Sequence, residues 1–111
     1  MTVPDTGEQV KHIGRRRYDR KSYFMVIDYA LKNRAYRDFI QDISAGGIFI
    51  ESRNNFPVGQ LISMTFPIPG DFRQVKVKGL IVRKTSNGMG VTFYPPSRRT
   101  SLRLKPFVEL L

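Results

Sequence analysis

Short apolar segments recur along most of this chain, and turn-forming residues separate them. The clearest segment runs from Val75 to Val82 and begins with valines alternating with lysines. Strict alternation is typical of a half-buried β-strand, because successive side chains of a strand point to opposite faces. Asn87-Gly88, a dipeptide that favours a tight hairpin, connects this segment to Met89–Phe93. Short strands separated by turns predict an all-β sandwich or barrel.

The same pattern predicts six strands in total, antiparallel wherever a turn defines their direction. The other four strands are expected at Phe24–Tyr29, Ala35–Ile43, Ile48–Ile50 and Ile62–Phe66. Turns are expected at Lys32-Asn33, at Ser44–Gly47, where the paired glycines would supply unusual backbone angles, and at Pro67–Asp71.

The segment after Pro95-Pro96 has a different pattern. Ser97 can cap a helix whose apolar positions continue through Leu104 to Leu111. Pro106 lies inside this segment, and proline removes a helical hydrogen bond and clashes with the preceding turn. A kinked helix, or two short pieces, is therefore predicted over about residues 97–111.

Composition restricts the class of protein. A chain of 111 residues is one domain with a modest core. It has no cysteine, which excludes a disulfide framework and a thiolate metal site. The lack of cysteine fits the cytoplasm, which is the expected location. No apolar stretch is long enough to span a membrane or to resemble a signal peptide. The formal net charge of +10 favours an anionic partner.

Much of the positive charge lies near the N-terminus. The segment Lys11–Lys21 reads KHIGRRRYDRK and contains six basic residues. Arginine suits phosphate because its planar fork donates paired hydrogen bonds and its face stacks on a purine. The segment therefore indicates either a phosphate-bearing partner or simply a solvated basic arm. Residues 1–14 are expected to be a flexible leader.

Catalysis has little support in this sequence. His12 is the only histidine, and the nine carboxylates show no spacing typical of a metal cage or an acid–base pair. No glycine-rich loop precedes a helix, so the nucleotide-binding fingerprints of that kind are absent. We therefore expect a protein that is not an enzyme, with no catalytic residue, no metal and no cofactor.

Two short motifs remain. Arg16 and Arg20 form R-x-x-x-R before the first expected strand. Asp42, Ser44 and Gly47 form D-x-S-x-x-G within the string QDISAGGIFIES, at an expected strand–turn–strand junction. Each motif alone has an ordinary explanation, since Asp and Ser side chains commonly satisfy the amides of a turn.

Together, and in this order, the two motifs resemble those of the PilZ family, the bacterial receptor domains for cyclic diguanylate. GMGVTFYPPS, from Gly88 to Ser97, is also similar to the family's last strand. The resemblance covers about residues 15–111. It implies a six-stranded antiparallel β-barrel with a C-terminal helical segment at about 97–111, preceded by a basic arm at 15–21.

The resemblance also implies a role for each motif residue. Asp42 and Ser44 would read a guanine edge, because a carboxylate accepts from guanine donors and a hydroxyl both donates and accepts. Gly46 and Gly47 would allow the backbone to approach a flat ligand closely. These residues would form the rigid half of the site.

The arm would form the mobile half, ordered only when ligand is bound. Arg16 and Arg20 would hold phosphate and stack on base. Arg15 stands directly before the motif, as in family members that take an intercalated dimer of the ligand. The ligand would thus be cyclic diguanylate, bound as two molecules per chain.

The favoured function is a non-enzymatic receptor or adaptor that passes its signal to an unidentified protein partner. The alternative is a small basic β-barrel that binds RNA or single-stranded DNA by stacking bases on aromatic side chains. Nucleic acid is disfavoured because the basic residues concentrate in the arm and the tail. A nucleic-acid barrel should show aromatic residues interleaved with basic residues on adjacent exposed strands, and the only such hint is Tyr36, near Arg34 and Arg37. A degenerate PilZ-like domain that binds only protein is a third interpretation, and the intact motifs argue against it.

Overall fold

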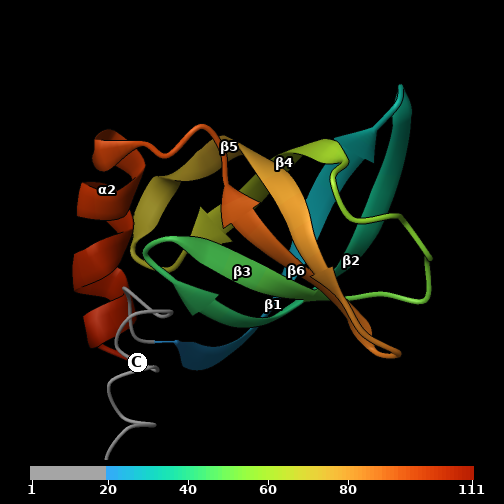
Figure 1. Cartoon of the computed structure of the whole chain (residues 1–111). Coiled ribbons are helices and arrows are strands. Elements are labelled where there is room, and N and C mark those ends of the chain that lie inside the picture. The colour runs from blue at the N-terminus through green and yellow to red at the C-terminus, as the bar shows by residue number, and fades with distance from the viewer. Residues whose placement is uncertain (1–19) are drawn as a thin grey trace, which may run out of the picture.

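The structure is a computed structural model that describes residues 20–111. The expected leader at 1–14 and most of the basic arm lie outside these residues. The described chain forms six strands followed by one helix (Figure 1). In chain order the elements are β1 (Lys21–Leu31), β2 (Arg34–Ser44), β3 (Gly47–Glu51), β4 (Leu61–Ile68), β5 (Asp71–Lys84), β6 (Gly88–Phe93) and α2 (Arg98–Glu109).

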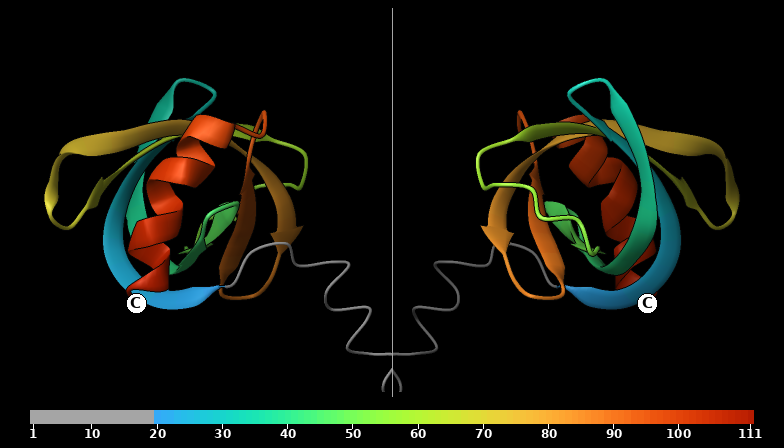
Figure 2. Two further views of the ribbon diagram at one scale, coloured as in Figure 1. Left: turned by 90° about the vertical axis from the view of Figure 1, so that its left-hand side faces the viewer. Right: turned by 90° about the vertical axis from the view of Figure 1, so that its right-hand side faces the viewer.

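The six strands close into an antiparallel barrel, as predicted. Their order around the barrel is β1-β2-β3-β6-β5-β4, and β1 closes the ring by pairing with β4 at Asp28–Ala30. The pairing of β3 with β6 joins strands that are distant in the sequence. Helix α2 lies across one end of the barrel (Figure 2). Within the described residues, no helix combines the length and apolarity needed to cross a membrane.

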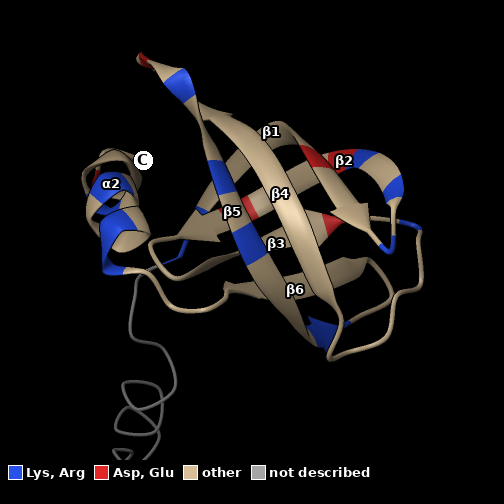
Figure 3. Ribbon diagram, turned by 90° about the horizontal axis from the view of Figure 1, so that it is seen from above, with Lys and Arg blue, Asp and Glu red and all other residues tan. Residues whose placement is uncertain are grey.

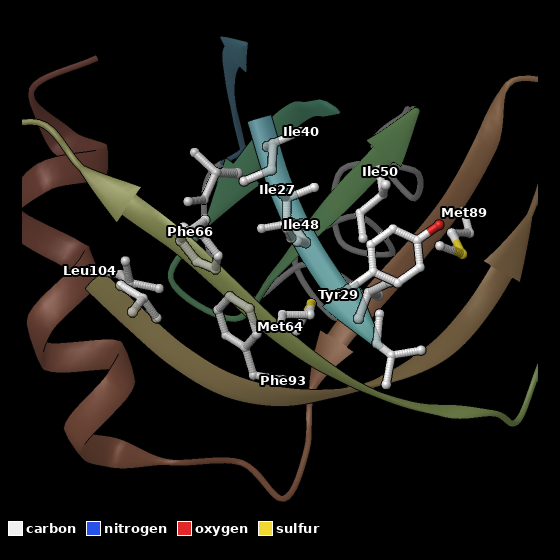
Figure 4. Packing of buried hydrophobic residues seen from close by; sticks show 14 of the residues in the cluster. Ile27, Tyr29, Ile40, Ile48, Ile50, Met64, Phe66, Met89, Phe93 and Leu104 are labelled. Atoms are coloured by element: carbon white, nitrogen blue, oxygen red, sulfur yellow. The ribbon is translucent and has the colours of Figure 1, made fainter. Parts of the chain in front are cut away.

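The core fills the inside of the barrel with side chains from all six strands. Figure 4 shows this packing, and its members include Ile27, Ile40, Ile48 and Phe66, each at most 1% exposed. Leu104 extends from α2 into the same core and is fully buried. Burial of such side chains stabilises the fold by about 1.5–3 kcal/mol each. The helix is therefore part of the core and not an appendage.

Two turns differ from the expectation. The turn predicted at Pro67–Asp71 is shorter, because β4 continues to Ile68 and β5 begins at Asp71. The hairpin between β5 and β6 exists, but Asn87-Gly88 is not a two-residue turn with positive φ angles. Its connection is Thr85–Asn87, and the Thr85 amide donates to the Gly88 carbonyl at 2.9 Å. Gly88 already belongs to β6, where a Cβ would lie 2.0 Å from the carbonyl oxygen of Ile50.

The helix also differs from the expectation, because α2 runs unbroken through Pro106. Ser97 caps it as predicted, and its Oγ accepts from the Thr100 amide at 3.2 Å. The bond that proline removes is the one to the Leu102 carbonyl. Leu102 is an exposed residue of the helix, 61% of its surface being accessible.

Candidate functional site

The two sequence motifs meet at the junction of β1 and β2. Arg20 directly precedes β1, and Ser22 of β1 is the cross-strand partner of Asp42 in β2. The Arg20 side chain therefore reaches Asp42 although 22 positions separate them, and its Nε and Nη2 donate to Oδ1 at 2.9 and 2.6 Å. Both side chains are partly buried, with 25% and 31% of their surface exposed. This ion pair is the centre of the candidate site.

The geometry of the pair leaves hydrogen-bonding groups available. Both Arg20 donors go to the same oxygen of Asp42. Within the described residues, Oδ2 of Asp42 accepts no hydrogen bond, and Nη1 of Arg20 donates none. A carboxylate acceptor and a guanidinium donor thus stand side by side at a partly exposed position. Such a pair can meet a planar ligand that has donors and acceptors on its edges.

Ser44 holds the turn between β2 and β3. Its Oγ accepts from the amides of Gly46 and Gly47 at 3.2 and 3.1 Å and lies 3.3 Å from the Gly47 carbonyl, to which it can donate. The residue is only 3% exposed. In this structure Ser44 shapes the loop beside Asp42, and its expected contact with guanine stays a prediction.

The two glycines of this turn do not have the unusual backbone angles expected of them. Among the described residues, the glycines with positive φ are Gly59 and Gly70. A Cβ on Gly47 would instead lie 2.3 Å from the carbonyl oxygen of Val91 in β6. Gly47 is therefore needed because two strands approach closely. That Gly46 and Gly47 also lie against a ligand stays a prediction.

Arg15 and Arg16 lie outside the described residues, so the structure does not place them. Of the predicted arm at 15–21 it places Arg20 and Lys21, and Lys21 already belongs to β1. Of the other motif residues it brings Asp42, Ser44, Gly46 and Gly47 together at one end of β2. No cluster of three or more metal-binding side chains occurs within residues 20–111.

Comparison of the sequence with models of known protein families identifies the family of this chain. The family model of the PilZ domain matches residues 14–110, nearly the whole chain. This chain belongs to the PilZ family. Among curated proteins, none matches its sequence.

Solved structures resemble this PilZ domain at low sequence identity. The Bacillus subtilis inhibitor of motility (MotI/DgrA) gives a TM-score of 0.74 at 18% identity, over 86% of this chain and 50% of that one. The PilZ domain of YcgR from Escherichia coli, solved with c-di-GMP, gives 0.69 at 18%, over 87% and 91%. Borreliella burgdorferi PlzA in complex with c-di-GMP gives 0.62 at 12%, over 93% and 44%. These likenesses show that the fold is shared, and this chain spans about half the length of the first relative.

Arg83 lies near the candidate site, and the sequence-based prediction did not include it. Arg83 of β5 places its Cζ 5.5 Å from the ring centroid of Phe49, which is the cross-strand partner of Asp42. Asp42 and Phe49 lie near each other in the sequence, whereas Arg83 is distant from both. The pairing of β3 with β6 and of β6 with β5 brings Arg83 to them. The available signal was Gly90, since a glycine within a strand often marks a close approach.

Proposed function

We propose that this PilZ domain is a non-enzymatic receptor for cyclic diguanylate. The observation that carries the proposal is the ion pair between Arg20 and Asp42, one residue from each family motif, at the surface of the barrel. Two structures that share the fold contain this ligand, which supports the assignment.

The available groups of the pair fit the edges of guanine. Guanine has two neighbouring N–H donors, which can bond to Oδ2 of Asp42, an oxygen that accepts no hydrogen bond from residues 20–111. Its O6 and N7 acceptors suit the paired donors of an arginine. Asp42 is negative and cannot attract phosphate, so its contribution must be the recognition of donors. Ser44, through the turn that it holds, fixes the backbone next to Asp42. A contact of Ser44 with the bound base would require its hydroxyl to turn away from the Gly47 carbonyl.

The arm supplies the charge that the phosphates need. Arg16 and Arg20 would contact phosphate and stack on base, and Arg15 would add a further cation. Two intercalated ligands bring four phosphates into one site, and their mutual repulsion demands extra positive charge. We therefore propose two ligand molecules per chain and expect Arg15→Leu to shift the stoichiometry toward one without abolishing binding.

Calorimetric titration tests affinity and stoichiometry together. Wild-type protein is titrated with cyclic diguanylate, with cyclic diadenylate as the matched purine control. We expect saturable binding of the first ligand, at two molecules per chain, and much weaker binding of the second. Saturation at one ligand would contradict the stoichiometry alone, whereas no binding would contradict the receptor assignment.

A single-stranded oligonucleotide tests the alternative function in the same experiment. The described Lys and Arg residues lie mainly on α2, on β5 and near the β1–β2 turn (Figure 3). Exposed aromatic rings do not alternate with them along neighbouring strands of the described barrel, as stacking of successive bases requires. We expect only weak, salt-sensitive oligonucleotide binding. The output of the receptor would then pass to a protein partner in the cytoplasm.

A further inference from the structure

Four strands contribute to one row of side chains on the outside of the barrel. Asp42 of β2 pairs with Phe49 of β3, Phe49 pairs with Gly90 of β6, and Gly90 pairs with Arg83 of β5. The row spans roughly 14 Å, since neighbouring strands lie about 4.8 Å apart. Asp42 and Arg83 therefore mark its two ends.

Register irregularities adjoin both ends of this row. One falls between Ile40 and Asp42, and the other falls between Ile81 and Arg83. A β-bulge re-aims the side chain beside it and commonly occurs next to binding sites. Ile40 and Ile81 are fully buried, whereas Asp42 and Arg83 reach solvent. The two irregularities thus direct the carboxylate of Asp42 and the guanidinium of Arg83 to the same outer surface.

Gly90 leaves room for the Arg83 side chain to extend across β6. A Cβ at this position would lie 3.2 Å from Nε of Arg83 and 3.4 Å from its Cβ. Without that atom, the Arg83 side chain passes over β6, and its Cζ lies above the Phe49 ring at 5.5 Å from the centroid. The guanidinium is therefore held one strand away from Asp42, although its backbone is three strands away.

The charge of Arg83 is not neutralised by the described part of the protein. Among residues 20–111 it forms no salt bridge, whereas Arg20 already holds Asp42. The Phe49 ring lies on one side of the guanidinium, and the residue as a whole is exposed. Phe49 itself is only 6% exposed although it belongs to the outer row. An arginine supported by a covered ring presents a fixed, flat cation to the solvent.

We propose that Arg83 is a further ligand-binding residue of the same site and that its guanidinium stacks on a purine base of the ligand. This inference rests on the proposed function, because it extends the site that Arg20 and Asp42 form. A guanidinium stacks well on a flat aromatic surface, and a base has such a face whichever edge Asp42 reads. Phe49 fixes the position of the guanidinium, so less side-chain freedom is lost on binding.

Two substitutions separate stacking from charge. Arg83→Gln removes both, and Arg83→Lys keeps the charge but removes the planar group. Lys76→Gln is the matched control, because Lys76 is also exposed on β5 and lies in a different row, opposite Thr65 of β4. We expect Arg83→Gln to raise the Kd for cyclic diguanylate by about tenfold or more, Arg83→Lys to raise it nearly as much, and the control to leave it unchanged. Unaltered thermal unfolding shows that each variant folds.

Gly90→Ala provides an independent test, because it retains Arg83 and only crowds it. The added Cβ meets a flexible side chain, so the barrel should stay folded while the guanidinium is displaced from Phe49. We expect weaker binding of cyclic diguanylate in this variant as well.

Each result supports or overturns the inference. If Arg83→Gln binds like the Lys76→Gln control while Arg20→Ala has lost binding, the receptor assignment stands and the role of Arg83 is wrong. If Arg83→Lys binds like wild type, Arg83 contributes only charge and the stacking assignment is wrong. If wild-type protein binds no cyclic diguanylate, the proposed function fails and this inference fails with it.

Discussion

The ion pair between Arg20 and Asp42 joins one residue of each sequence motif. The described chain contains a second arginine–aspartate pair between β1 and β2, formed by Asp28 and Arg37. The Asp28 side chain is 55% exposed and the Arg37 side chain 73%, against 31% for Asp42 and 25% for Arg20. Water screens such exposed charges strongly, so the Asp28–Arg37 pair contributes little. It is a natural control for the site pair, because the same two residue types pair across β1 and β2 at an exposed position.

Arg20→Ala is expected to weaken ligand binding severely and to leave the fold intact. A hydrogen bond to a charged group contributes about 1.5–3 kcal/mol to a complex, whereas an ion pair near the surface changes folding stability by about 1 kcal/mol at most. Calorimetry and urea unfolding measure the two effects separately. Arg37→Ala should change neither. Wild-type affinity in Arg20→Ala, with normal circular dichroism, would exclude Arg20 from the site.

Asp42→Ala is expected to lose discrimination between purines more than it loses attraction for phosphate. The wild-type carboxylate can accept from guanine, whose donors adenine lacks at the same edge, and a negative group cannot bind phosphate. The ratio of affinities for cyclic diguanylate and cyclic diadenylate should therefore fall toward one. A variant that keeps the wild-type ratio would show that Asp42 only holds Arg20 and the turn.

At this scale the sequence predicted one site from two motifs, and the structure places Arg20 and residues 42–47 of it but not Arg15 or Arg16. The roles of these residues toward a ligand stay predictions. The meeting of Arg20 with Asp42 follows from two motifs at the ends of neighbouring strands. The burial of Ser44 and the steric role of Gly47 depend on β6, which lies far away in the sequence. Arg83 was missed because its relation to Phe49 requires the register of strands that no local pattern specifies.

Helix α2 is held to the barrel through contacts in both of its halves. Arg103 donates to Oδ2 of Asp71 at 3.2 Å and to the carbonyls of Arg73 and Gln74 at the start of β5. Toward the other end, the Phe107 ring packs edge-on against Tyr23 of β1, with centroids 5.1 Å apart. The helix therefore links the β4–β5 hairpin to the strand that follows the arm.

Arg103→Ala is expected to lower the midpoint of thermal unfolding, because it releases α2 from β5. Arg99→Ala is the matched control, since Arg99 is an exposed arginine of the same helix. The Arg73 amide, together with the side chains of Arg103 and Arg73, lowers the pKa of Asp71 below its ordinary value of 3.8. The contribution of Asp71 is thus present above pH 3.8 and is lost as the pH falls through the lowered pKa. Equal midpoints for the two variants at neutral pH would contradict this role of Arg103.

The elements were predicted well where local patterning decides them. All six strands were located, because alternation and turn residues are local signals. Some strands, such as β1 and β5, are longer than predicted. Polar residues extend a strand when a neighbouring strand pairs with their backbone hydrogen-bonding groups. The continuity of α2 through Pro106 depends on packing of Leu104 and Val108 against the barrel, which outweighs one lost hydrogen bond.

The whole barrel should respond to alkaline pH through a buried phenol. Tyr29 is 2% exposed, and its hydroxyl donates to Oδ2 of Asp38 at 2.6 Å. Burial, reinforced by that carboxylate, raises the pKa of Tyr29 from 10.0 to about 12. The folded state therefore keeps its proton where the unfolded state loses it. The contribution of Tyr29 to stability is fully present below pH 10 and is lost between pH 10 and about 12.

Phenolate absorbance followed through an alkaline titration measures this effect. The chain has five tyrosines, and a late-ionising fraction should be present in wild type and reduced in Tyr29→Phe. Urea unfolding at neutral pH and above pH 10 gives the matching loss of stability. Ionisation of all tyrosines near pH 10 in the folded protein would contradict the burial of this phenol.

Closure of the barrel could be expected from the family resemblance but not from the strand pattern alone, which allowed a sandwich as well. The contacts that decide it, β1 with β4 and β3 with β6, join segments far apart in the chain. Their formation depends on the shape of the complete core and on how tightly strands can approach at Gly47 and Gly88.

A closed ring also restricts how another protein can dock. Each described strand already has two neighbours, so the backbone hydrogen bonds that an exposed sheet edge offers to a visiting peptide are largely taken. Recognition must then depend on side chains of the outer wall, the loops or α2, and these can be exchanged one at a time without rebuilding the scaffold. A barrel of this kind can therefore acquire a different docking surface while its strands and their order stay the same.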